Sequence, residues 1–142
     1  MKKMSVIIVC TLLLIWFFLD MIGLYFDNTY LVTQSYKDDG IFFIIYIITF
    51  LLFIFKEKIG KFFLNAWLIM WFITQFLSHW YFTITGSGLG KIEYFKGSIK
   101  LFESQTRYFP DVYHIVLHIL ILISIIFINI YIFKIKKNKK EQ

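Results

Sequence analysis

Four long apolar segments, at residues 6–26, 41–55, 62–84 and 112–133, constrain the fold of this chain more than any other feature. Three of them are 21–23 residues long, close to the ~20 residues that a helix needs to cross the hydrocarbon core of a bilayer. Hydrophobic residues make up 59% of the 142 residues. The segments predict an all-α polytopic membrane protein with a four-helix transmembrane bundle, as one domain over residues 1–142.

The second segment, residues 41–55, is shorter than the others. Its 15 residues would form a helix of only ~22 Å. Snorkelling of Lys56 or local thinning of the bilayer would let it span. The distribution of lysines, described next, also favours a span here. It places both termini on the same side of the membrane, which requires an even number of spans.

Basic residues are concentrated on one side of the predicted membrane. With a cytoplasmic N-terminus, the inner side carries ten lysines against two glutamates, whereas the outer side carries five basic and six acidic residues. The positive-inside rule therefore predicts a protein of the cytoplasmic membrane with both termini cytoplasmic. The five lysines of residues 134–140 would adjoin the lipid headgroups, so the positive net charge does not indicate a nucleic-acid partner.

The N-terminal segment and the cysteine content exclude several alternatives. The first apolar run is too long for a signal peptide and lacks a small-x-small cleavage motif. Cys10 follows Val9, so it does not form a lipoprotein signal. As the single cysteine, it also excludes an internal disulfide and a Cys-x-x-Cys motif.

The connection between the third and fourth spans contains an amphipathic pattern. Its glycine-rich start, residues 86–90, predicts a turn. Apolar side chains then recur at helical spacing over residues 91–109, with charged residues on the other side. This pattern predicts an amphipathic interfacial helix. Two roles remain open for it: a connector resting on lipid, or a lid over a site.

Ionisable and polar residues interrupt the apolar segments at one common depth. His114 and His118 are four residues apart and share a helix face. By the 1.5 Å rise per residue, six side chains fall within a slab of roughly 8–10 Å near the outer surface. Ionisable groups at this depth are costly and indicate a functional site. The candidate pocket residues are Asp20, Tyr46, Gln75, His79, His114 and His118.

Four interpretations of this layer remain open. His79, His114, His118 and Asp20 match a tetrahedral zinc shell, although the His-Glu-x-x-His motif is absent. His79 with His114 or His118 matches b-type haem ligation, which the one-sided placement of the histidines disfavours. A metal-free pocket would bind a proton or another ligand, with Asp20 paired to a histidine. Interhelical hydrogen bonding alone would serve only structure.

The sequence therefore predicts a small integral membrane protein with an outward-facing polar pocket for a metal ion, a proton or a lipid headgroup. A non-enzymatic accessory subunit or immunity-type protein is the alternative, acting through a membrane-protein partner or a homo-oligomer. No motif identifies a catalytic residue. If the chain is an enzyme, a metal-dependent intramembrane hydrolase or lipid-modifying enzyme is the class that these residues favour.

Overall fold

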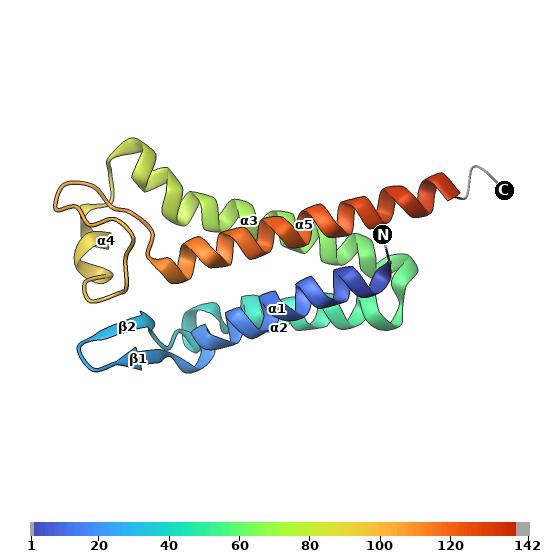
Figure 1. The fold of residues 1–142 in the computed structure, drawn as a ribbon, viewed down its shortest axis with the longest axis horizontal. Helices are drawn as coiled ribbons and strands as arrows, with labels where there is room; N and C mark the ends of the chain where they lie inside the picture. Colours follow the sequence, from blue (N-terminus) through green and yellow to red (C-terminus); the bar gives the residue numbers. More distant parts are fainter. Residues whose placement is uncertain (1, 139–142) are drawn as a thin grey trace.

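The computed structural model describes residues 2–138 and consists mainly of helices. Its elements follow one another as α1 (Lys3–Ile22), β1 (Leu24–Phe26), β2 (Thr29–Val32), α2 (Tyr36–Phe55), α3 (Glu57–Thr85), α4 (Leu89–Tyr94) and α5 (Val112–Asn138). The four long helices run side by side (Figure 1). Each packs on two others, around a ring in the order α1, α2, α3, α5.

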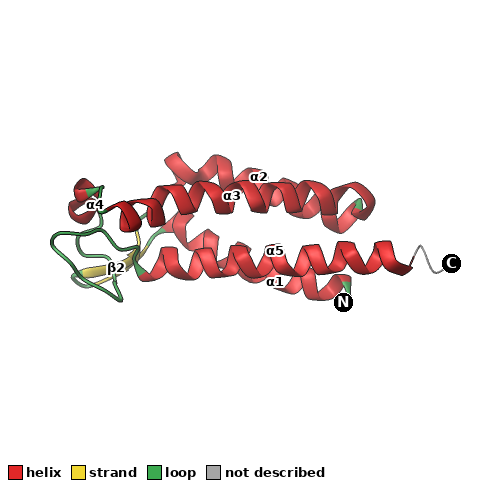
Figure 2. Ribbon diagram, turned by 90° about the horizontal axis from the view of Figure 1, so that it is seen from above, coloured by secondary structure: helices red, strands yellow, loops and turns green. Residues whose placement is uncertain are grey.

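The two ends of the bundle differ. The N-terminus, the turn between α2 and α3, and the end of α5 lie together at one end, here called the terminal end (Figures 1 and 2). The β1–β2 hairpin, α4 and residues 95–111 lie at the opposite end, here called the loop end. An even number of long helices brings the start of α1 and the end of α5 to the same end of the bundle.

All four long helices are long and apolar enough to cross a membrane. In the most apolar 18-residue stretch of each helix, only 22–39% of the residues are buried inside the protein. The remaining faces expose large aliphatic side chains, including Ile8, Ile44 and Ile73, each more than half exposed. An apolar surface of this extent is unfavourable in water. The fold points to a helical membrane protein.

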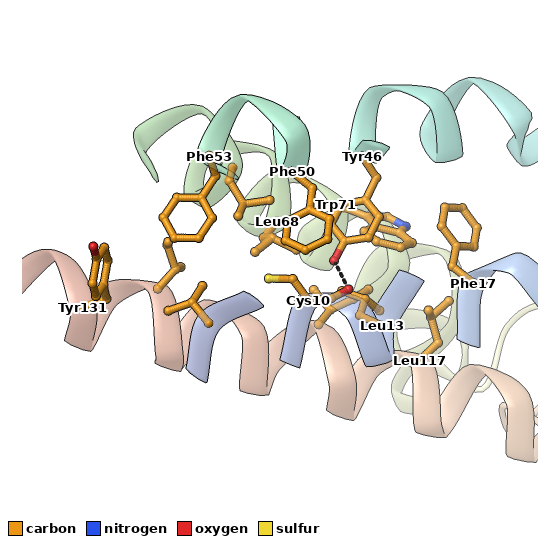
Figure 3. Close-up of a cluster of buried hydrophobic side chains, with 14 of the residues drawn as sticks. Cys10, Leu13, Phe17, Tyr46, Phe50, Phe53, Leu68, Trp71, Leu117 and Tyr131 are labelled. Carbon is orange, nitrogen blue, oxygen red and sulfur yellow. Dashed lines mark hydrogen bonds between the residues drawn. The ribbon is translucent and has the colours of Figure 1, made fainter. Parts of the chain in front are cut away.

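Aromatic and aliphatic side chains from all four long helices form the core (Figure 3). Phe17 packs against Trp71 with 4.5 Å between ring centroids. The Tyr46 hydroxyl donates a hydrogen bond of 2.8 Å to the carbonyl oxygen of Cys10. Cys10 itself is buried as a free thiol. Tyr46 thus satisfies its one polar group inside an otherwise apolar layer.

Two predicted spans begin or end at different residues in the structure. The first helix ends at Ile22 rather than residue 26, because Gly23 adopts a φ of 75° and residues 24–26 pair with β2. The second helix begins at Tyr36 rather than residue 41 and has 20 residues, or ~30 Å of helix. It is therefore long enough to span without snorkelling. The other two predicted spans lie within α3 and α5.

The predicted amphipathic helix over residues 91–109 is wrong in its extent. The helix there, α4, has only six residues and ends at Tyr94. Gly97 adopts a φ of 88°, and Ser98 then forms a parallel bridge with Tyr30 of β2. Backbone hydrogen bonds of 3.1 and 3.0 Å join Tyr30 to Gly97 and Ile99. Pairing with the hairpin replaces the helix that the apolar spacing favoured.

A small polar network joins all four long helices at the terminal end. Lys3 of α1 lies 3.5 Å from the Glu57 carboxylate of α3 and donates a hydrogen bond of 2.8 Å to the carbonyl of Ile54. The Tyr131 hydroxyl of α5 donates to the same carboxylate at 2.7 Å. Two of the five lysines of residues 134–140, Lys139 and Lys140, lie outside the residues that the structure describes.

Candidate functional site

A cavity of about 160 Å³ lies at the loop end of the bundle. It is lined by residues of α1, β2, α2, α3, α4 and the start of α5, so segments far apart in the sequence contribute to it. Three of its charged or titratable residues are almost fully buried: Asp111 is 1% exposed, Asp20 4% and His79 5%. The polar side chains that line it include Asp20, Ser35, Asp39, Gln75, Ser78, His79, Lys91, Asp111 and His114.

A larger hollow of about 780 Å³ lies over residues 92–109. Its charged side chains include Glu93 and Lys96, which pair with each other at 3.2 Å while both remain largely exposed. Exposed pairs of this kind contribute little energy and need no ligand. Buried charges, in contrast, are costly without a partner. The smaller cavity is therefore the candidate functional site.

Asp20 and Asp39 bring two acidic groups to one wall of the cavity. Asp20 lies in the last turn of α1, and its carbonyl accepts a hydrogen bond of 2.8 Å from the Ser35 amide after the hairpin returns the chain. The Asp20 carboxyl lies next to the side chains of Ser35 and Asp39. Asp39 is in the first turn of α2, where a negative charge is favourable near the positive end of the helix dipole.

Asp111 and His114 also line the cavity. One carboxylate oxygen of Asp111 accepts hydrogen bonds from the backbone N–H of His114 at 2.9 Å and from its ring Nδ1 at 2.7 Å. The first bond caps the N-terminus of α5. The second places the ring proton on Nδ1, which leaves Nε2 as the basic nitrogen of the His114 ring. A single carboxylate therefore fixes both the helix start and the orientation of the imidazole.

His79 is held by Tyr108 from the loop that precedes α5. Their side chains lie 2.5 Å apart, from His79 Nδ1 to the Tyr108 hydroxyl. Burial, reinforced by the charge of Asp111, raises the pKa of Tyr108 well above its usual range. The hydroxyl therefore keeps its proton and donates a hydrogen bond to Nδ1, so this nitrogen of His79 is an acceptor.

The three histidines lie together at the loop end. The rings of His79 and His114 have centroids 4.0 Å apart and are tilted by 32°. The ring of His118 lies 5.7 Å from that of His79, and its Nδ1 hydrogen-bonds the His114 carbonyl one turn earlier. Phe95 packs against both His79 and His114, at 5.8 and 5.3 Å.

Of the six predicted pocket residues, four line the cavity: Asp20, Gln75, His79 and His114. His118 packs behind them, with its ring 6.4 Å from Phe72 and 6.1 Å from Trp80. Tyr46 lies in the apolar core with its hydroxyl bonded to Cys10.

Several residues that line the cavity were not predicted as pocket residues, among them Asp39, Lys91 and Asp111, and neither was Tyr108, which contacts His79. Asp39 was assigned to an outer loop, although two consecutive acids at a helix start could have signalled it. Lys91 and Tyr108 enter through the folded loop and carry no sequence signal.

The predicted zinc shell does not match the observed arrangement. Within residues 2–138, no group of three His, Cys, Asp or Glu side chains is placed to hold a metal ion. The ring centroids of His79 and His114 lie 4.0 Å apart, which leaves no space for a porphyrin between the two rings. The Nδ1 atoms of the predicted histidine ligands instead form hydrogen bonds within the protein: His79 with Tyr108, His114 with Asp111, and His118 with the carbonyl of His114.

No known protein family, curated protein or solved structure matches this chain. The fold and the site therefore define the class only by its structure: a bundle of four helices, each long and apolar enough to span a membrane, with a small, acidic polar cavity at its loop end.

Proposed function

We propose that this protein is an integral membrane protein that binds a small cation in the loop-end cavity. One observation carries the proposal: three carboxylic side chains, from Asp20, Asp39 and Asp111, line the same small cavity, together with a single lysine, Lys91. Desolvated acids repel one another and are costly to bury. A bound cation would offset that cost.

The size of the cavity limits the ligand. A volume of about 160 Å³ corresponds to roughly five water molecules at ~30 Å³ each. Typical drug-sized pockets start at ~300 Å³. The cavity therefore suits a partly hydrated ion or an organic group of a few heavy atoms, and a lipid could offer only the end of its headgroup.

The charge distribution supports an outward-facing site. Among residues 2–138, the terminal end carries eight lysines and one acid, Glu57, whereas the loop end carries most of the acids. By the positive-inside rule, both termini are cytoplasmic in this proposal and the cavity opens toward the outer aqueous phase. Its ligand would then arrive from outside the cell or from the outer leaflet.

Cation-dependent thermal stability of the purified protein in detergent tests the proposal. Sodium, magnesium, zinc and methylammonium salts are compared at one pH and one ionic strength, because a ligand that binds the folded state raises the unfolding temperature. At least one of these cations is expected to stabilise the protein. Absence of any cation-specific stabilisation would refute cation binding at this cavity.

Two neighbouring aspartates provide a matched pair of variants. Asp39→Asn removes a charge that lines the cavity, and Asp38→Asn removes an adjacent charge that is exposed and outside it. We expect Asp39→Asn to abolish the cation response and Asp38→Asn to retain it. Equal responses in the two variants would show that the cation acts on the general surface charge and would contradict the proposal.

A further inference from the structure

Lys91 of α4 places its ammonium group among three aromatic rings at the edge of the cavity. Its Nζ lies 5.0 Å from the ring centroid of Phe82, 5.7 Å from that of Tyr108 and 5.9 Å from that of Phe95. These distances fall within the ~6 Å range of a cation–π interaction. Lys91 forms no ion pair within the part of the chain that the structure describes.

The surroundings of Lys91 are only partly hydrated. Burial lowers the pKa of its ammonium group below the usual value. A charged group that loses water without gaining a carboxylate partner needs another source of stabilisation. The faces of three rings provide it, because their quadrupoles attract a cation.

Asp20, Asp39 and Asp111 lie in the same cavity lining as Lys91 and Phe95. The site thus combines carboxylates with ring faces. Hard inorganic cations prefer shells made of several oxygen ligands, whereas ring faces favour an ammonium group that carries methylene or methyl groups. The lysine side chain is itself an alkylammonium, so its position shows which kind of group the rings accommodate.

We propose that the ligand of this cavity is an organic ammonium group and that Lys91 occupies the aromatic part of the site until this ligand displaces it. This inference rests on the proposed cation-binding function and adds the chemical class of the ligand. The ammonium can belong to a free small amine or to the amine end of a lipid headgroup, since the recognised chemistry is the same. Lys91 then acts as an internal competitor.

Removal of the Lys91 charge tests the competition directly. Lys91→Met keeps an apolar side chain and removes the ammonium group. Ethanolamine and tetramethylammonium should then bind roughly ten-fold more tightly, because the variant lacks both the competing cation–π interaction and a like charge. Lys96→Met is the matched control, because Lys96 is exposed, pairs with Glu93 and lies outside the cavity. Affinities are measured by calorimetry in detergent. Unchanged or weaker binding to Lys91→Met would overturn the inference.

A second variant covers the case in which Lys91→Met does not fold. Phe82→Leu removes the nearest ring and keeps apolar bulk, so it should weaken ethanolamine binding several-fold and leave any response to sodium or magnesium unchanged. A wild-type protein that binds inorganic cations but neither amine would refute the inference while leaving the proposed function intact. Loss of every cation response would refute both.

The source of the ammonium group is distinguished in nanodiscs. Ethanolamine binding is compared between discs of phosphatidylglycerol and discs that also contain phosphatidylethanolamine. Competition by phosphatidylethanolamine would identify the lipid headgroup as the ligand. Equal ethanolamine binding in both discs would identify a free amine, and either result supports ammonium recognition.

Discussion

At the level of single residues, buried polar groups at the loop end depend on one another in pairs. Asp111 holds His114 through two hydrogen bonds, and Tyr108 holds His79 through one. Each pair joins the loop before α5 to a helix, and the two imidazole rings pack against each other at a tilt of 32°. Because an unpaired buried polar group costs about 1–3 kcal/mol, the loss of one partner should destabilise the whole loop end.

Tyr108→Phe tests this dependence through its pH profile. At neutral pH the variant should be less stable by about 1–3 kcal/mol, because His79 loses its hydrogen-bond donor. The folded pKa of Tyr108 is raised above the unfolded value of about 10. The stability that its neutral hydroxyl contributes is thus fully present below pH ~10 and declines as the pH rises further.

The measurement is the unfolding temperature of both proteins from about pH 8 to about pH 11. The difference between wild type and Tyr108→Phe should shrink toward the alkaline end. Tyr81→Phe is the control, because Tyr81 is half exposed and should follow wild type throughout. A difference that stays constant or widens at high pH would argue against a buried, proton-donating Tyr108.

The candidate site was partly predictable because membrane depth can be counted along a helix. Asp20, Gln75, His79 and His114 were found in this way, from ionisable and polar residues within apolar runs. Asp39 was not, because the start of α2 is hydrophilic and resembles a loop. Lys91 reaches the cavity, and Tyr108 reaches His79, only through the fold of residues 86–111, and helical periodicity gives no information about such a path.

At the level of elements, the junction of α2 and α3 depends on one glycine. A Cβ atom added to Gly60 would lie 2.3 Å from the carbonyl oxygen of Leu52 and 2.4 Å from the Cα of Phe53. Both are backbone atoms and cannot rotate away. The two helices, separated by Lys56 alone, therefore approach each other at a distance that only glycine permits.

Two alanine substitutions at helical glycines test this close approach. Gly60→Ala should destabilise the protein by at least about 1–3 kcal/mol, the usual cost of overpacking. Gly40→Ala places its Cβ in open space within α2, so it should gain about 0.5–1 kcal/mol from helix propensity. Unfolding in mixed detergent micelles measures both. Similar effects of the two substitutions would mean that α2 and α3 are not in such close contact.

A pair of asparagines links α3 and α5 within the apolar part of the bundle. The side-chain amides of Asn65 and Asn129 donate to each other at 3.1 Å. Asn129→Leu should cost about 0.6–1.7 kcal/mol, as for other polar pairs in membranes, because Asn65 then loses its partner. The Asn65→Leu/Asn129→Leu double variant should recover much of this loss, which a double-mutant cycle would measure. Additive losses would exclude a direct pair.

The sequence predicted the four long helices but not the structure of the loop end. Long apolar runs predicted four helices because only helices satisfy their own backbone groups in lipid. The 91–109 segment was predicted as a helix from its spacing alone. In the structure, the backbone of residues 97–99 pairs with Tyr30 instead. A tertiary contact with a hairpin that was itself not predicted decided that outcome.

At the level of the whole molecule, charge and topology agree. Four long helices bring both termini and the α2–α3 turn to the terminal end, with its excess of lysines. The loop end carries most of the acids and the cavity. A bilayer that retains lysines on its cytoplasmic side would orient this bundle in one direction only, and the proposed cation site would then face outward.

Single cysteines at the two ends test this orientation. In a Cys10→Ala background, Gln105→Cys places a thiol on the exposed loop end and Lys58→Cys places one on the exposed terminal end. A membrane-impermeant maleimide added to intact cells should label the Gln105→Cys protein. It should label the Lys58→Cys protein only after the membrane is permeabilised. The reverse pattern would turn the cavity toward the cytoplasm, so that its cation would have to be an intracellular one.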